Sequence, residues 1–283
     1  MAPTPEAVRA YLAEFLSDPR VVELPRWLWL PLLHGLVLRR RPAQSAAKYA
    51  QVWTPEGSPL AVHTARQAKL LGEALGLPVE HAMRYGEPSV GTALRRLTGR
   101  VRVIPLYPQY ARSTTESVRD VVGRDVDFVE QFHDHPAYID ALAGLVQERP
   151  EVLVMSFHGL PQRAVDRGDP YREQCLRTAE LLARALGLAP SQYRVTFQSR
   201  FGPARWLQPY TSAVLAELGA ARVGRVDVIC PGFVADCLET LEEIAIEGKR
   251  TFVEAGGGEY RALPCLNESP RWIAALAEIA RGR

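Results

Sequence analysis

The sequence lacks a long apolar stretch and makes sparing use of cysteine. No uninterrupted apolar run approaches the roughly 18 residues needed to cross a bilayer, so no membrane-spanning helix is expected. Only four cysteines occur in 283 residues, and they form neither a CxxC pair nor a cluster with histidine at zinc spacing. This pattern excludes a disulfide framework and the common zinc modules. Because a signal peptide is also absent, the expected compartment is the reducing cytoplasm.

Strong charge and the familiar cofactor-binding motifs are missing as well. A net charge of +2 is too small to predict a nucleic-acid partner. There is no GxSxG, no Walker loop and no GxGxxG, so the sequence motifs of the α/β-hydrolases, P-loop proteins and dinucleotide-binding enzymes are absent. HDH at His133–His135 resembles a metal-ligand spacing, but Pro136 follows it. That order is typical of a helix cap with proline at the first helical position.

What the chain does contain is an alternation of strand-like and helix-like segments, which predicts α/β architecture. A weak internal repeat accompanies it, in which SPLAVHTARQAKLLGEALGLP (58–78) aligns with DPYREQCLRTAELLARALGLA (169–189). Both segments begin with proline at a helix start and end in Leu-Gly-Leu, a glycine stop. Farther on, 101–117 parallels 226–243 as strand, proline-containing loop and helix, although the register drifts.

This duplication predicts two similar halves, 1–150 and 151–283, with a C-terminal helix from Pro270 that packs back on the first half. Short strands are expected after each repeated helix, at AMRYG near Tyr85 and at RVTFQS near Phe197. The second half has a strand, VLVMSFH, before its repeated helix. The first half has no counterpart before Pro3, so we expect either that this half lacks its leading strand or that the true start of the chain lies upstream of Met1.

One stretch, EVLVMSFHGL (151–160), brings a titratable side chain to the end of a buried strand. Ligands bind at the carboxyl ends of strands in open α/β sheets, and His158 lies at such an end. A histidine in this position is a base, a metal ligand or a satisfied residue under a loop. The strand alone does not decide between them.

A row of carboxylates follows another predicted strand. Asp236, Glu239, Glu243 and Glu247 have the spacing of one helix face. The helix dipole accounts for acidic residues in the first turn, but like charges spaced three or four apart repel. The row therefore indicates either cation binding and proton transfer or a solvated face.

Two loops at strand ends combine aromatic residues with arginines, at 107–117 and at 197–211. That combination suits a flat, conjugated ligand that carries carboxylates. The segment Trp27–Leu38 is rich in tryptophan and leucine and is followed by Arg39, Arg40 and Arg41. It is interpreted either as a core helix with a basic end or as an apolar lip at a membrane or a pocket, and Pro31 disfavours a long buried helix.

Together these motifs resemble those of ferrochelatase, the family that inserts ferrous iron into a porphyrin in haem synthesis. The resemblance rests on SFHGLPQR, YPQY with the following STT, TFQSRFG with WLQPYT, and CPGFVADCLETLEEI, and it extends almost from end to end. It implies two Rossmann-like, chelatase-type halves, with parallel sheets flanked by helices and the porphyrin in a cleft between them.

The resemblance also implies roles for individual residues. His158 matches the family's active-site histidine, Glu239 its acidic partner across the cleft, and Glu243 the next carboxylate on an acidic path. His158 and Glu239 are thus the expected contacts of the substrate Fe²⁺. The expected porphyrin contacts are Arg40, Arg41, Tyr49, Ser58, Tyr107, Gln109, Tyr110 and Ser113.

The function implied is a protoporphyrin ferrochelatase that converts protoporphyrin IX and Fe²⁺ to protohaem. Alternatives are a chelatase for coproporphyrin or cobalt, and a porphyrin- or haem-binding protein without turnover. We expect a cytoplasmic monomer with peripheral membrane contact through Trp27–Leu38, no nucleic-acid partner, no cofactor and no iron–sulfur cluster. The family usually opens with an apolar strand that this chain lacks, and we expect a misassigned start codon rather than a true truncation.

Overall fold

The contacts within the chain divide it into two compact units. The computed structural model describes residues 2–123, 126–200 and 202–282. Unit 1 comprises Met1–Pro105 and Ala111–Glu130, and unit 2 comprises Leu106–Tyr110 and Gln131–Arg283. The predicted division at residue 150 rests on the sequence repeat and stays a prediction.

Unit 2 is built on a four-stranded parallel sheet in the order β4-β3-β5-β6. Its strands are β3 (Val152–His158), β4 (Tyr193–Gln198), β5 (Arg225–Ile229) and β6 (Glu259–Ala262). Its helices are α7 (Pro136–Ala143), α8 (Gln162–Asp166), α9 (Tyr171–Ala185), the short 3₁₀ helix η3 (Pro190–Gln192), α10 (Thr211–Ala220), the π-helix η4 (Glu239–Gly248), α11 (Lys249–Glu254) and α12 (Pro270–Arg281).

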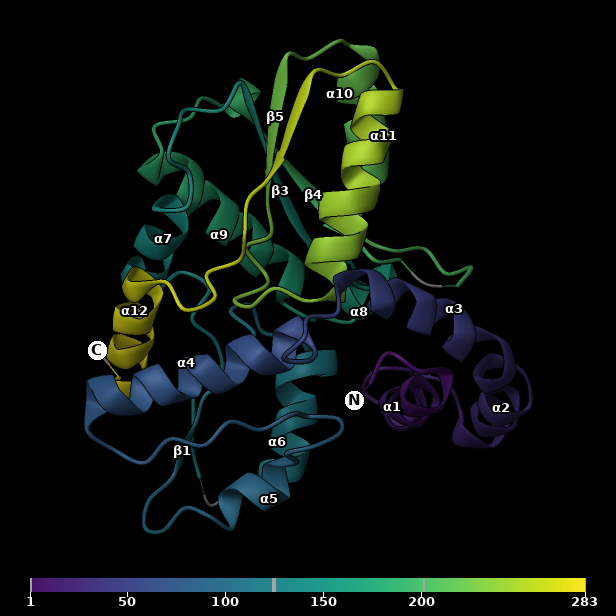
Figure 1. Cartoon of the computed structure of the whole chain (residues 1–283), viewed down its shortest axis with the longest axis vertical. Coiled ribbons are helices and arrows are strands. Elements are labelled where there is room, and N and C mark those ends of the chain that lie inside the picture. Colours follow the sequence, from purple (N-terminus) through teal and green to yellow (C-terminus); the bar gives the residue numbers. More distant parts are fainter. Residues whose placement is uncertain (1, 124–125, 201, 283) are drawn as a thin grey trace. The chain divides into compact units, whose positions relative to one another are not determined.

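The strand order creates a switch point beside β3. The chain runs from β3 outward to β4, then returns past β3 to β5 on its other side. In Figure 1, α7 and α9 lie on one side of this sheet, and α10 and α11 lie on the other. Such a switch point leaves a crevice at the carboxyl ends of the strands, so ligands are expected where β3 and β5 end.

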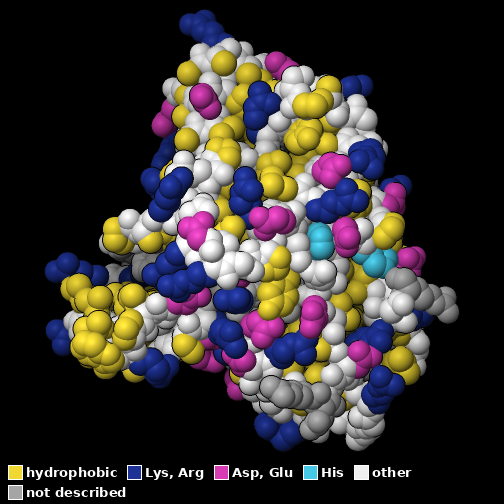
Figure 2. All heavy atoms as spheres, turned by 180° about the vertical axis from the view of Figure 1, so that it is seen from behind, with side chains coloured by type: hydrophobic (Ala, Val, Ile, Leu, Met, Phe, Trp, Pro, Cys, Tyr) yellow, Lys and Arg dark blue, Asp and Glu magenta, His cyan; other side chains and the backbone are white. Residues whose placement is uncertain are grey.

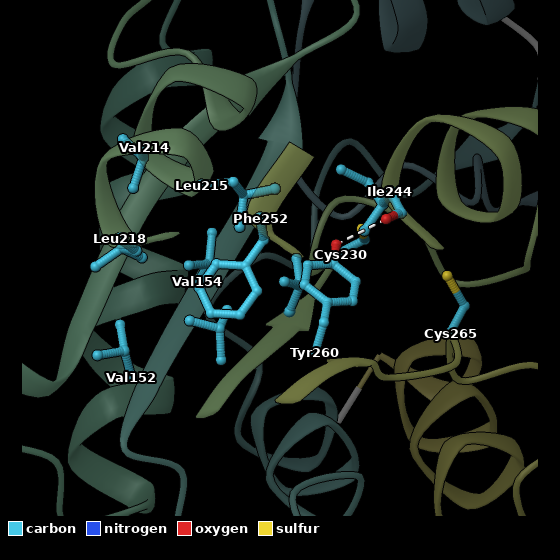
Figure 3. Packing of buried hydrophobic residues seen from close by; sticks show 12 residues of the cluster. Val152, Val154, Val214, Leu215, Leu218, Cys230, Ile244, Phe252, Tyr260 and Cys265 are labelled. Carbon is cyan, nitrogen blue, oxygen red and sulfur yellow. Dashed lines mark hydrogen bonds between the residues drawn. The ribbon is translucent and has the colours of Figure 1, made fainter. Parts of the chain in front are cut away.

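Burial on both faces explains why β3 reads as a continuous apolar run. Every residue from Val152 to Phe157 is buried, and only His158 at the end is partly exposed. One face packs on α10 and α11, where Phe252 is completely buried among Val154, Leu215 and Tyr260 (Figure 3). The predicted strand near Phe197 is confirmed as β4, and the predicted C-terminal helix is confirmed as α12, which packs against α7.

Unit 1 is mostly helical. It contains a two-stranded parallel sheet of β1 (Arg102–Val103) and β2 (Asp127–Phe128). Its helices are α1 (Pro5–Ser17), α2 (Arg26–Leu32), the π-helix η1 (Leu33–Val37), α3 (Leu38–Val52), α4 (Pro59–Leu75), α5 (Val90–Leu94), the π-helix η2 (Arg112–Glu116) and α6 (Ser117–Val122). The repeated helices are confirmed as α4 and α9, and α4 ends at Gly76 in the left-handed conformation that its glycine stop predicts.

The strand predicted near Tyr85 was wrong. In the described part of unit 1, extended backbone there makes a single bridge, between Met83 and Ser89. A strand needs a neighbour along its length to satisfy its N–H and C=O groups, and one bridge does not provide it.

A buried carboxylate organises the region instead. Asp18 accepts hydrogen bonds from the Arg84 guanidinium (2.6 Å), the Tyr85 hydroxyl (2.8 Å) and the Ser117 hydroxyl (2.6 Å). Burial raises the pKa of Asp18, but the bonds from Ser117, the Arg20 N–H and Tyr85, with the charge of Arg84, outweigh it and lower the pKa overall. This network fixes the start of α6, directly after η2.

The segment Trp27–Leu38 combines features of both interpretations given above. α2, η1 and α3 follow one another without a break although Pro31 lies inside α2, and the segment is not the long buried helix that Pro31 disfavours, because much of its apolar surface is exposed. The wide turn of η1 shifts the hydrogen-bond register after the proline. One side of the segment buries Trp29 and Leu33, while the other exposes apolar side chains to solvent.

Candidate active site

His158 ends β3, the strand at the centre of the switch point. It is partly buried, its Cα pairs with that of Gln198 across the β3–β4 register, and its ring lies 6.3 Å from that of Phe233, in the loop after β5. Three strand ends therefore contribute to one region. The backbone carbonyl of His158 accepts a 2.9 Å hydrogen bond from the Tyr171 hydroxyl, which fixes the strand end to α9.

The position of the His158 ring also selects its tautomer. Nδ1 lies 2.7 Å from the carbonyl oxygen of Gly159. Because a carbonyl oxygen only accepts, Nδ1 carries the proton in this contact, and the neutral ring keeps its lone pair on Nε2. Nε2 is then the atom that accepts a proton or ligates a cation.

Gly159 is required by close packing after the histidine. A Cβ at this position would lie 2.7 Å from the Gln198 carbonyl oxygen and 3.2 Å from the Trp206 ring. The Gly159 N–H donates to that same carbonyl at 2.7 Å. The loop after β3 and the end of β4 therefore approach each other more closely than any side chain would permit.

The predicted acidic helix forms as η4, a π-helix over Glu239–Gly248. Glu239 and Glu243 are both partly buried on it, one turn apart. Two-turn π-helices are rare because the i→i+5 pattern is less favourable than the α pattern, and π geometry is frequent at functional sites. The interpretation of Glu239 and Glu243 as solvated surface carboxylates is disfavoured by their partial burial.

Two consecutive residues at the end of β4 hold this helix. The Gln198 side-chain N–H donates 3.0 Å to the Glu239 carbonyl, and the Ser199 N–H donates 2.8 Å to Oε1 of Glu243. The Ser199 hydroxyl donates to the second carboxylate oxygen, Oε2. Gln198 is itself fixed, because its Oε1 accepts a 2.6 Å bond from the buried Ser156 hydroxyl on β3. A continuous set of contacts thus links β3, β4 and η4.

Asp236 does not belong to the carboxylate row. It precedes the helix, and its oxygens accept from the Thr240 hydroxyl (2.9 Å), the Asn267 amide (2.7 Å) and the Cys265 N–H (3.3 Å). The expectation that Asp236 shares a helix face with Glu239 was wrong, because its carboxylate ties the start of η4 to the loop after β6. Glu247, at the far end, pairs with Arg250.

The predicted porphyrin contacts divide between the units. In unit 1, Arg40 is exposed on α3, and Arg41 and Tyr49 are half-buried on the same helix. Tyr49 meets Trp53 edge-on, with ring centroids 6.3 Å apart. Ser58 precedes α4, and Ser113 lies half-buried in η2.

In unit 2, the YPQY segment is largely engaged internally. Gln109 exposes only 2% of its surface, and its amide donates 2.9 Å to the Thr178 hydroxyl. Tyr110 is fixed through its N–H, which donates 2.7 Å to Gln174, while Tyr107 is half-buried. The buried amide of Gln109 gives a ligand little to contact, and its predicted role as a porphyrin contact stays a prediction.

Gln198, Ser199 and Tyr260 were missed as site residues by sequence reasoning. The Tyr260 hydroxyl donates 2.7 Å to the Ile244 carbonyl inside η4. The available signal was the polar Gln-Ser pair directly after the apolar strand YRVTF, a place where β-branched or turn-forming residues are more usual. No such signal marked Tyr260.

No group of three or more His, Cys, Asp or Glu side chains is gathered as a metal site in the described ranges 2–123, 126–200 and 202–282. Within the same ranges, no helix is long and apolar enough to cross a membrane.

Known proteins resemble this chain closely in sequence. A family model described as ferrochelatase matches residues 2–283. The ferrochelatase of Azoarcus sp. strain BH72 is 55% identical, over 99% of this chain and 84% of that protein. The ferrochelatase of Chromobacterium violaceum is 52% identical, with coverage of 99% and 84%.

Solved structures resemble the fold at low sequence identity. SirB from Bacillus subtilis with Fe³⁺ has a TM-score of 0.55 and 14% identity, over 78% of this chain and 88% of that one. CbiX, described as the terminal enzyme for siroheme biosynthesis in denitrifying bacteria, has a TM-score of 0.53 and 17% identity, over 80% and 94%. These neighbours confirm the predicted chelatase fold. The sequence matches, which cover nearly the whole chain, show that it belongs to the ferrochelatase family.

Proposed function

We propose that the chain inserts Fe²⁺ into protoporphyrin IX to form protohaem, with His158 at the reacting centre and the carboxylates of η4 beside it. The main support is the family match over residues 2–283, together with relatives named ferrochelatase that are 52–55% identical. The position of His158 at the switch point of the unit 2 sheet adds a physical reason for the site.

The reaction requires groups of the kind found here. Two pyrrole N–H protons leave the porphyrin, the lone pairs of all four macrocycle nitrogens bind Fe²⁺, and water leaves the cation. A neutral imidazole accepts protons near neutral pH and also ligates ferrous iron. With Nδ1–H held by the Gly159 carbonyl, His158 presents Nε2 for either task.

In this scheme Glu239 and Glu243 interact with the two positively charged species, Fe²⁺ and the released protons. Carboxylates attract Fe²⁺ and accept protons, so a row of them along η4 is suited to escort the cation or to carry protons away. Binding energy from the macrocycle would supply the bending that turns a nitrogen lone pair toward the metal. We assign macrocycle binding to the predicted contacts, which are Arg40, Arg41, Tyr49, Ser58, Tyr107, Gln109, Tyr110 and Ser113.

The apolar surface of α2 and η1 suits contact with a membrane. Exposed fractions are 75% for Trp27, 53% for Leu28, and 45% for both Leu32 and Leu36. Figure 2 shows a patch of hydrophobic side chains with basic ones around it at the lower left, where this segment lies. Tryptophan and leucine flanked by arginines favour the interface of an anionic bilayer, so we propose peripheral attachment there at the cytoplasmic face. An apolar substrate such as protoporphyrin would be available from the same surface.

Membrane attachment is tested by sedimentation with vesicles of phosphatidylcholine and phosphatidylglycerol. Wild-type protein is expected to pellet with the vesicles, and the double variant Trp27→Ser, Leu28→Ser to remain in the supernatant. Leu77→Ser, an exposed leucine on the loop after α4, is the matched control. Equal pelleting of all three proteins would contradict attachment through this surface.

Metallation is tested with purified protein, Fe²⁺ and protoporphyrin under anaerobic conditions, with haem absorbance as the readout. Haem formation above the uncatalysed rate is expected. A parallel assay with coproporphyrin compares the two substrates. Porphyrin binding without metallation of either one would contradict the proposed activity and favour a binding protein.

A further inference from the structure

Ser199 has a backbone conformation that is unusual for serine. Its φ is +63°, in the left-handed region that non-glycine residues seldom adopt. Such conformations persist where the surroundings hold them, and they concentrate at functional sites. At Ser199 the surroundings are visible, because both of its donors point to one carboxylate, that of Glu243.

The two bonds fix Glu243 in position and in orientation. The Ser199 N–H donates 2.8 Å to Oε1, and the hydroxyl donates to Oε2. A carboxylate held by one donor rotates about its last torsion, whereas two donors from the same residue stop that rotation. Each oxygen of Glu243 still has a lone pair left for a cation or a proton.

Gln198, the residue before Ser199, makes a second contact with η4, one helical turn before Glu243. The Gln198 amide donates to the Glu239 carbonyl at 3.0 Å, and Gln198 pairs with His158 across the strands. Strand pairing and hydrogen bonds therefore connect His158, the Gln198–Ser199 pair and η4, which carries Glu239 and Glu243.

We propose that Ser199 is a positioning residue for the metal-handling carboxylates, fixing Glu243 so that it receives Fe²⁺ in a defined orientation. This inference rests on the proposed function, because it assumes that Glu243 handles the metal. It assigns Ser199 a role toward the cation and none toward the macrocycle. Loss of the Ser199 hydroxyl should therefore raise the KM for Fe²⁺ and leave the KM for porphyrin nearly unchanged.

Two substitutions separate this role from a purely structural one. Ser199→Ala removes the hydroxyl and keeps the strained backbone. Ser199→Gly removes the same hydroxyl, keeps the N–H donor and relieves the strain. The glycine variant should therefore be the more stable of the two in thermal unfolding, while both should lose the same bond to Glu243. Ser212→Ala, on the exposed start of α10, is the control.

Steady-state kinetics with Fe²⁺ and porphyrin varied separately provide the readout. Both Ser199 variants are expected to raise the KM for Fe²⁺ by about tenfold, the effect of losing one charge-assisted hydrogen bond. The porphyrin KM should stay within about twofold of wild type, as should both constants in Ser212→Ala. Recovery of the wild-type Fe²⁺ KM in Ser199→Gly, or equal changes in both KM values, would overturn the proposal.

Calorimetric titration with Co²⁺ alone separates failure of this inference from failure of the proposed function. If wild-type protein forms no haem, the proposed function fails, and Co²⁺ affinity still measures the carboxylate arrangement. About tenfold weaker Co²⁺ binding in both Ser199 variants supports the positioning role. Equal affinity in wild type and variants contradicts it, whether or not haem is formed.

Discussion

The Tyr260 hydroxyl donates a 2.7 Å hydrogen bond to the Ile244 carbonyl, from strand β6 to the middle of η4 (Figure 3). Tyr260 is buried, and burial raises the pKa of its hydroxyl well above the ordinary value, so the group remains a donor. Gly248, one turn beyond Ile244, leaves room for it, since a Cβ there would lie 2.5 Å from the hydroxyl oxygen. The wide helix is therefore held from the sheet as well as from Ser199.

Removal of this hydroxyl should loosen η4. Tyr260→Phe leaves the Ile244 carbonyl buried without that donor, and we expect a loss of about 1–2 kcal/mol in the free energy of unfolding. Amide hydrogen exchange in 244–254 should become faster. Tyr193→Phe, on the edge strand β4, is the control, and unchanged exchange in Tyr260→Phe would show that the bond does not hold the helix.

Replacement of His158 should abolish metallation and leave porphyrin binding intact. Without an imidazole to accept a proton or ligate Fe²⁺, the rate in His158→Ala should fall by at least about 10²-fold. Porphyrin affinity, followed by quenching of tryptophan fluorescence, should change little. His81→Ala, outside the site, is the control. Near-normal turnover in His158→Ala would remove this residue from the mechanism.

A methyl group after the histidine should separate the two strand ends. In Gly159→Ala the new Cβ meets the Gln198 carbonyl at 2.7 Å, so the backbone must shift. Overpacking of this kind costs about 1–3 kcal/mol, and the shift also moves Gln198 away from η4. We expect a lower unfolding temperature and a lower kcat. Gly168→Ala, where no atom lies within 4 Å of the new Cβ but φ is positive, measures the cost of glycine loss without a clash.

Unit 1 should lose stability in acid through Asp18. The native pKa of this carboxyl is below its ordinary value, and the unfolded value is about 3.9. Its stabilising contribution is thus complete above about pH 4 and is lost as the pH falls through the native pKa. Asp18→Asn should cost about 3 kcal/mol at pH 7, because Arg84 then lacks a partner for its charge.

The pH dependence provides the check on this assignment. Urea unfolding of wild type and Asp18→Asn should differ most at neutral pH and converge below about pH 4. A constant difference over the whole range would show that the carboxylate charge is not the source. Asp120→Asn, whose exposed carboxylate pairs with Arg20, is the control and should have a small effect.

Much of the fold of unit 2 was predictable, because its sequence patterns are local and strong. The apolar run before His158 predicted a buried strand, and the paired Leu-Gly-Leu stops predicted two matched helices, α9 in unit 2 and α4 in unit 1. The absence of a strand near Tyr85 was not predictable, since strand formation depends on neighbouring strands that the local pattern does not reveal. Nor did the sequence indicate that the helical segment continues past Pro31. It continues because the π-helix η1 provides a wide turn after the proline, and packing against the rest of the chain, which the local pattern does not show, decides whether such a turn forms.

The chemistry of the site was more visible than its geometry. His158, Glu239 and Glu243 stood out as titratable groups at strand ends and along one helix. Spacing alone grouped Asp236 with the glutamates, whereas its hydrogen bonds to Asn267 and Thr240 separate it from them. The role of Ser199 depends on a positive φ, and a serine gives no sign of that in sequence.

All four cysteines are buried, and burial raises the pKa of each thiol above its ordinary value. Thiolates, not thiols, react with peroxide and with alkylating reagents. Ferrous iron in air generates such oxidants, so a protein that receives this cation gains resistance to its own substrate by keeping its sulfur protonated and enclosed. In the folded chain the cysteines should not react with thiol-labelling reagents, so the rate at which they are labelled measures the rate of unfolding.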